Sequence, residues 1–278
     1  MRDALGPLHA SLEIWRRTEQ YDGISATAGN LSEIYLNLGL LPDALHFGKE
    51  ADGAAQIGKN QRDRIAQRTT YAEALHRIGN YEEALQLFEE AEGLQLDYGR
   101  PDDLLGSFWG YRFNDLLLTI KDASRVISRN ELVLAGAKKR GAPLEIALAQ
   151  LSIVRARYAL AEIHSNLITE ASEVVDSLTK LQSYIYLPIA LLTRARCEFS
   201  RGNRKAARID LSRASKMCEA QEMHLVLWEC IFERARFAFL KGNSKAAMRT
   251  ALTLRRRISG YRRLEDACDG LLQGNALY

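Results

Sequence analysis

The chain has 278 residues, of which 47% are hydrophobic and 26% charged, and its mean hydropathy is −0.23. This composition is typical of a soluble protein with a sizeable core, and no apolar run is long enough for a membrane-spanning helix. The net charge of +3 neither requires nor excludes an acidic partner. Because the four cysteines have no paired spacing and no signal-peptide pattern is present, we expect a reduced, cytoplasmic setting.

The sequence predicts helices and no sheet. It has only five prolines and long stretches rich in Ala, Leu, Glu, Arg and Gln. Residues 3–18 form the first predicted helix, and residues 262–273 form an amphipathic closing helix. Between them we expect six helical hairpins, each with a first and a second helix. These hairpins span 23–56, 61–96, 102–137, 143–182, 185–219 and 223–259.

A repeat runs through these predicted hairpins. An alanine follows the short turn of each unit, and successive alanines lie 36 to 48 residues apart. These are Ala4, Ala44, Ala84, Ala123, Ala171, Ala207 and Ala247. A fixed period of this size indicates a solenoid, in which the small alanine lets two helices approach closely.

Four units have a glycine five residues before that alanine, where a helix ends with a residue in the left-handed conformation. These are Gly39, Gly79, Gly202 and Gly242. In the unit of Ala123 the glycine is replaced by Leu118, and in that of Ala171 by Asn166. The repeat pattern is therefore degenerate in these two units.

One segment resembles a known repeat family. The sequence AEALHRIGNYEEALQLFEEAE, residues 72–92, is similar to a tetratricopeptide repeat, since small and aromatic residues stand at the motif's offsets: Ala72, Gly79, Tyr81, Ala84, Phe88 and Ala91. The resemblance implies an all-α fold, a solenoid of tetratricopeptide-like hairpins that forms a right-handed superhelix. It also implies that the first helices line a concave groove, which binds a protein or peptide.

A narrower resemblance covers the later part of the chain. Three phrases carry it: LLGSFWGYRFNDLLL (104–118), YLPIALLTRARCEFSRGNRKAARIDLSRA (186–214) and MHLVLWECIFERARFAFLKGN (223–243). Together they resemble the C-terminal repeat arrays of bacterial STAND-type NTPases. This implies a non-catalytic sensor arm that follows effector and NTPase domains. A free-standing tetratricopeptide adaptor and the sensor arm of a transcription activator are the alternatives.

Pairs of arginines recur in three first helices. Arg194 and Arg196 flank an apolar stripe, as do Arg234 and Arg236, and Arg155 and Arg157 form a third copy. By the resemblance, the residue after the small position faces the groove. Arg157, Arg196 and Arg236 would then form a ladder that binds carboxylates or phosphates, because guanidinium forks match both groups.

A structural role for these arginines is the alternative. Arg194 and Glu198 are spaced as an i,i+4 pair, and Glu233 and Arg236 as an i,i+3 pair. Ion pairs of this kind would satisfy the arginines within the repeats. The sequence favours this structural role over ligand binding.

No catalytic, metal or cofactor site is predicted. The string GAAQIGKN (53–60) resembles a P-loop but has Asn60 where the magnesium-binding hydroxyl is needed and no preceding strand. The five histidines lie in different repeats, and none has a second histidine or a cysteine three or four residues further on. The acidic pair in PDD (101–103) fits the start of a helix. The basic tail RRRISGYRR (255–263) fits a helix end, so the sequence does not favour nucleic acid as a partner.

The predicted first helix has no partner before it. Leu5, Leu8, Leu12 and Trp15 share one face of segment 3–18, and in a repeat array a preceding helix would cover part of it. We therefore expect the chain to be part of a longer protein with upstream domains.

Overall fold

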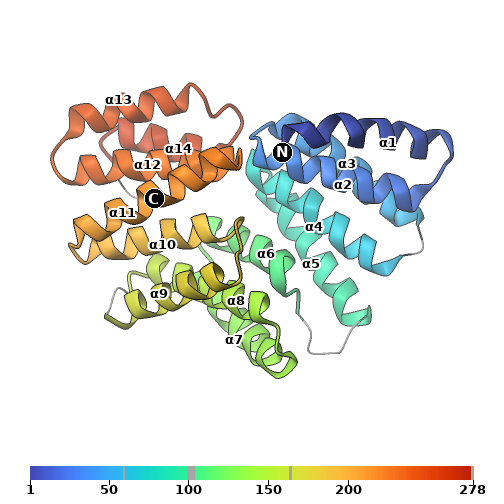
Figure 1. Cartoon of the computed structure of the whole chain (residues 1–278), viewed down its shortest axis with the longest axis horizontal. Coiled ribbons are helices and arrows are strands. Elements are labelled where there is room, and N and C mark those ends of the chain that lie inside the picture. The colour runs from blue at the N-terminus through green and yellow to red at the C-terminus, as the bar shows by residue number, and fades with distance from the viewer. Residues whose placement is uncertain (59, 99–103, 163–164, 277–278) are drawn as a thin grey trace. The chain divides into compact units, whose positions relative to one another are not determined.

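The computed structural model describes residues 1–58, 60–98, 104–162 and 165–276. Within these ranges the chain forms fourteen α-helices, a short 3₁₀ turn at Arg2–Ala4 and no strand, in agreement with the predicted all-α fold. Figure 1 shows the helices in chain order. They group into two compact units, Met1–Ile120 (unit 1) and Lys121–Tyr278 (unit 2), and each is described by itself. None of the described helices is both long enough and apolar enough to cross a membrane.

Unit 1 consists of helices that pack on their neighbours along the chain. In addition, α2 contacts α4, and α4 contacts α6. The helices are α1 (Leu5–Arg17), α2 (Tyr21–Asn37), α3 (Leu41–Ile57), α4 (Gln61–Ile78), α5 (Tyr81–Tyr98) and α6 (Ser107–Thr119).

Unit 2 follows the same plan. Neighbours along the chain pack together, and α8 contacts α10, α10 contacts α12, and α12 contacts α14. The helices are α7 (Ala123–Arg140), α8 (Pro143–Ala159), α9 (Ser165–Lys180), α10 (Leu187–Ser200), α11 (Arg204–Ala220), α12 (His224–Leu240), α13 (Ser244–Arg255) and α14 (Arg262–Leu272).

Most helices begin and end within a few residues of the predicted bounds. The largest difference concerns the predicted hairpin 102–137. Its first helix begins at Ser107, after Gly106 in an extended conformation, and the hairpin spans the division between the two units. The acidic pair at 102–103 lies outside the described residues. The last second helix ends at Arg255 rather than 259.

Left-handed residues mark the turns after the first helices. Gly39, Gly79, Gly202 and Gly242 have φ values of 70°, 93°, 86° and 84°. At the two degenerate turns the left-handed residues are Lys121 (φ 66°) and Ala161 (φ 58°), whereas Leu118 and Asn166 lie inside helices. A residue with a Cβ can take this conformation at some cost in strain, so a missing glycine does not remove the turn.

In five of the six hairpins the residue five positions after the left-handed residue packs at the close helix contact, whereas after Ala161 that position is the exposed Asn166. Ala44, Ala84, Ala207 and Ala247 occupy this position, and each is fully buried. After Lys121 the same position is Val126, also fully buried, so the repeat register there is three residues later than Ala123 indicated. Ala4 lies in the 3₁₀ turn and is exposed.

The apolar face of α1 packs on α2 and α3. Leu12 is fully buried in a cluster with Ala28, Leu31 and Phe47, while Leu5, Leu8 and Trp15 are partly buried against the same cluster. Leu12 therefore anchors α1, and the rest of the apolar stripe keeps some exposure.

Candidate functional site

A charged residue recurs at one position of the first helices. We call these residues rungs: each lies six residues before the left-handed residue of its turn, and successive rungs are 40 to 42 residues apart. The rungs of unit 1 are Glu33, Glu73 and Asp115, and those of unit 2 are Arg155, Arg196 and Arg236. Thus the rungs are acidic in one unit and basic in the other.

The rungs lie on the inner side of each unit. First helices of successive hairpins contact one another, whereas α3 with α5 and α9 with α11 make no comparable contact in the described residues. Helices that converge on one side and separate on the other form a curved layer, with the first helices on its inner side. The residue before each rung is buried: Ser32, Ala72, Asn114, Val154, Ala195 and Ala235. Since consecutive helix side chains point about 100° apart, the rung itself borders this inner surface.

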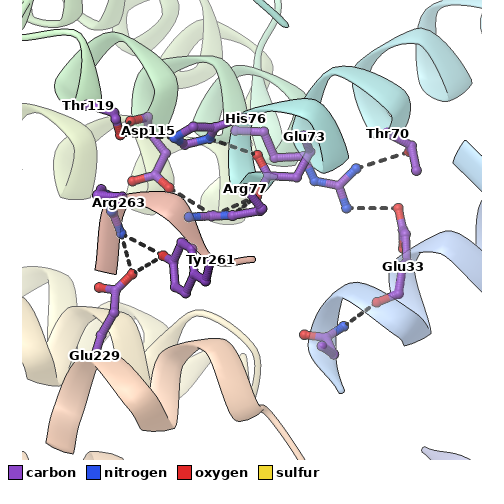
Figure 2. A network of polar contacts seen from close by, with 12 residues as sticks. Glu33, Thr70, Glu73, His76, Arg77, Asp115, Thr119, Glu229, Tyr261 and Arg263 are labelled. Carbon is purple, nitrogen blue, oxygen red and sulfur yellow. Dashed lines mark hydrogen bonds and ion pairs between the residues drawn. The ribbon is translucent and has the colours of Figure 1, made fainter. Parts of the chain in front are cut away.

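The rungs of unit 1 are joined by arginines of neighbouring helices (Figure 2). Arg112 of α6 donates to Glu33 Oε1 at 2.8 Å and to Thr70 Oγ1 at 3.2 Å. Arg77 of α4 lies between the other two rungs, with its Nη2 2.6 Å from Glu73 Oε1 and 2.8 Å from Asp115 Oδ2. These ion pairs fix α2, α4 and α6 relative to one another.

His76 completes this network. Its Nε2 lies 2.9 Å from Thr119 Oγ1, and its Nδ1 lies 3.5 Å from Glu73 Oε2. Glu73, His76 and Asp115 are three buried groups that could ligate a metal ion. However, the Arg77 guanidinium already binds both carboxylates and would oppose a second cation there. We therefore assign the cluster to ion pairing rather than to metal binding.

Burial and charge shift the pKa values of this cluster. Burial raises the pKa of Glu73, but the positive charge of Arg77 and the neighbouring His76 outweigh it, and the pKa falls to about 2. Burial lowers the pKa of His76, and the positive charge of Arg77 lowers it further. The carboxylates of Glu73 and Asp115 raise this pKa, but they do not outweigh burial. At neutral pH Glu73 is ionised and His76 is neutral.

In unit 2 two of the three basic rungs bind the same acidic residue. Glu233 of α12 is fully buried and accepts hydrogen bonds from Arg196 Nε at 2.8 Å and from Arg236 Nε at 2.7 Å. Arg236 also donates to the Tyr158 hydroxyl at 3.2 Å. The pair expected between Glu233 and Arg236 is present. Arg194, by contrast, pairs with Asp210 at 2.7 Å rather than with Glu198.

A second carboxylate of α12 binds the closing helix region. Glu229 accepts from the Tyr261 hydroxyl at 2.6 Å and from Arg263, and Arg263 also lies over the Tyr261 ring. Tyr261 is 1% exposed, so the aromatic residue of the basic tail packs in the core. It cannot stack on a nucleic-acid base.

Arg157 lies elsewhere than the sequence predicted. It donates to both carboxylate oxygens of Glu170 on α9, at 2.8 and 2.7 Å, and so faces a second helix. Arg155 occupies the rung position of α8, counted back from Ala161. The prediction took Arg157 because it follows the small residue Ala156, whereas the left-handed Ala161 places Arg155 six residues before the turn.

The three acidic rungs were missed from the sequence. Glu33 and Glu73 stand directly after the small positions Ser32 and Ala72, so the rule that selected the arginines would have found them too. Asp115 was hidden because Lys121 replaces the turn glycine. Lys59 of the P-loop-like string and His164 lie outside the described residues.

Comparisons with known proteins show the fold. No protein-family model and no curated protein matches this chain. Among solved structures, BtubC (BKLC) from P. vanneervenii matches with a TM-score of 0.57 and 14% identity, over 78% of this chain and 90% of that chain. A Rap protein complexed with competence and sporulation factor matches with a TM-score of 0.56 and 12% identity, over 90% and 79%.

A third solved structure with a similar fold consists of TPR-like repeats. A kinesin light chain of Podosopora anserina with nearly identical TPR-like repeats has a TM-score of 0.50 and 18% identity, over 70% of this chain and 95% of that chain. The chain therefore has a tetratricopeptide-like helical repeat fold, as its sequence predicted.

Proposed function

We propose that the protein is a non-catalytic recognition scaffold that binds a protein or peptide on the inner faces of its first helices. The observation that carries this proposal is the recurrence of one charged rung on each first helix. The rungs also form ion pairs that join neighbouring helices, but Glu33 remains 41% exposed and so presents a charged group to a ligand. The Rap protein that matches in fold was solved with a factor bound, which supports the same use here.

Exposure differs among the rungs and indicates where a ligand can reach. The Glu33 side chain is 41% exposed, whereas those of Glu73 and Asp115 are 8% and 3% exposed. Glu33 can thus accept a further hydrogen bond from a basic ligand group while it keeps Arg112. In unit 2 the side chains of Arg196 and Arg236 are only 11% and 12% exposed and already bind Glu233. Arg157 is 29% exposed, and we propose it as the basic residue that an acidic ligand group reaches.

The larger protein is a second part of the proposal. The resemblance to STAND-type NTPase arrays favours a sensor arm over a free-standing adaptor or the arm of a transcription activator. The reading frame upstream of this sequence distinguishes these three kinds of protein. A P-loop module in frame supports the NTPase, a helix-turn-helix module the activator, and a start codon at Met1 the adaptor.

A peptide library tests the scaffold function directly. The pure protein is screened against random 12-residue peptides, and selected peptides are titrated by fluorescence polarisation. Peptides bound by unit 1 should be rich in Lys and Arg, and Glu33→Gln should weaken them by about 1.5–3 kcal/mol, the usual value of a charged hydrogen bond. The matched control is Glu82→Gln, an exposed acid on α5. Selection of no peptide, or equal loss in both variants, would contradict the proposal.

A further inference from the structure

The mild net charge of the chain conceals a strong asymmetry. Residues 1–120 contain 11 basic residues (Lys and Arg) and 19 acidic residues (Asp and Glu), which gives a net charge of −8. Residues 121–278 contain 27 basic and 16 acidic residues, which gives a net charge of +11. Basic charge concentrated in one part of a chain is typical of surfaces that bind polyanions. This asymmetry is independent of the rungs, which contribute three charges to each unit.

Much of the excess lies on two second helices. We define the basic outer face as Lys205, Arg208 and Lys216 of α11, Lys245 and Arg249 of α13, and Arg256 directly after α13. All six are exposed, and none has a carboxylate within ion-pair distance among the residues that the structure describes. The two acids of α11 do not neutralise it, since Asp210 is buried against Arg194 and Glu219 stands at the helix end.

The repeat aligns these cations. Lys205 and Lys245 are 40 residues apart, as are Lys216 and Arg256, so each pair occupies equivalent positions of successive hairpins. Both helices pack on α12 through the opposite side, which carries buried Ala207 and Ala247. The cations therefore point outward in the same direction from two consecutive repeats.

Helix stability does not explain these positions. Lys205 and Lys245 lie in the first turns of α11 and α13, which contain no acidic residue. Positive charge in a first turn opposes the helix dipole, and an acid would be favoured there. Cations that are unpaired, exposed and unfavourable for their own helix are more simply explained by a partner.

We propose that the basic outer face binds the phosphate backbone of a double-stranded nucleic acid. Arginine forks match phosphate oxygens, and the 17 residues of α11 span about 25 Å, long enough to follow several phosphates. Neither α11 nor α13 contains an aromatic residue, so the face offers no stacking platform for single-stranded bases. Its exposed large apolar residues are Ile209 and Leu252, too few for insertion into a membrane surface.

Binding to a labelled 24-base-pair DNA duplex of random sequence tests the proposal. Affinity should fall steeply with salt. For each tenfold rise in salt, log Kd should increase by about 0.9 per phosphate contact. The triple variant Lys205→Gln, Lys245→Gln, Arg249→Gln should bind roughly tenfold or more weakly and lower that slope by about 2 to 3. Circular dichroism of the variant should be unchanged, because glutamine is a good helix former.

A matched control separates the face from overall charge. Lys138, Lys139 and Lys180 are exposed in the same unit, and their replacement by Gln removes the same charge. The control should keep wild-type affinity and salt slope. Equal loss in both triple variants, or no duplex binding at 50 mM salt, would overturn the proposal. Tighter binding to polyglutamate or to phosphatidylserine vesicles at the same salt would also overturn it and assign the face to an acidic protein or a membrane.

Discussion

Arg196 of α10 donates from Nε to Glu233 of α12 over 2.8 Å, so a basic rung of one hairpin is tied to the buried carboxylate of the next. Glu233 also accepts from Arg236 of its own helix, and its side chain is fully buried. Glu233 thus contacts two guanidinium groups that are themselves about nine-tenths buried, and Glu229 lies 3.6 Å from Arg196 as a further acidic partner. Charges removed from water remain stable only with such partners.

Loss of Glu233 should therefore be costly. In Glu233→Gln the two arginines lose a charged partner while they remain buried, and we expect the free energy of unfolding to fall by about 3–5 kcal/mol. Urea denaturation measures this. The control is Glu170→Gln, which removes the partner of Arg157 where both side chains are about one-third exposed. That variant should lose only about 0–1 kcal/mol. Similar losses would show that Glu233 has no special role.

The close contact after each turn makes a second prediction. Ala247 is fully buried, so Ala247→Leu should overpack the contact of α12 and α13 and lower the free energy of unfolding by about 1–3 kcal/mol. Its neighbour Ala246 is exposed, and Ala246→Leu should change stability by less than about 0.5 kcal/mol. Thermal or urea unfolding of both variants gives the comparison. If Ala247→Leu matched wild type, the register of the repeat would be wrong.

The neutral, buried His76 makes stability depend on pH. Its pKa is lowered in the folded protein, so below about pH 6.5 the unfolded chain binds a proton that the folded chain does not. Stability should then fall as the pH falls, by at most about 1.4 kcal/mol per pH unit for this one group. The free energy of unfolding, measured between pH 7.5 and 5.5, should lose this slope in His76→Gln. A His46→Gln control should retain it. An unchanged slope in His76→Gln would contradict the prediction.

The helical hairpins were predictable because their signals are local. Apolar spacing and turn glycines are read within a few residues, and the bounds of most helices follow from them. The predicted repeat register was wrong in the hairpins where those signals changed. Lys121 and Ala161 take the left-handed conformation without being glycine, and this displaced Val126, Asp115 and Arg155 from the predicted pattern.

The partners of the charged side chains could not be predicted from sequence. Arg77 and Asp115, or Arg196 and Glu233, are 38 and 37 residues apart and meet only through packing of successive repeats. The sequence search for i,i+4 pairs therefore assigned Arg194 to Glu198 rather than to Asp210. The segregation of charge was available from the sequence, but the small sum of +3 concealed it.

The cysteines provide a chemical measure of the core. All four, Cys197, Cys218, Cys230 and Cys268, are buried free thiols. Burial raises the pKa of Cys197 and of Cys268 to about 12. The hydrogen bond with Cys230, together with burial, raises the pKa of Cys218 as well. Since only the thiolate is nucleophilic, native protein at pH 8 should react slowly with a thiol reagent, and the denatured chain should react at once at all four positions.

The comparison of native and denatured protein can be made at single thiols. Mass spectrometry after brief iodoacetamide treatment should show no modified cysteine in native protein and four in guanidinium. In Glu233→Gln, if our first prediction holds, modification of Cys218 and Cys230 should accelerate. Cys230 lies in α12, the helix that carries Glu233, and Cys218 lies in the adjacent α11. Rapid native labelling of any of the four would show that the core of unit 2 opens far more readily than its packing indicates.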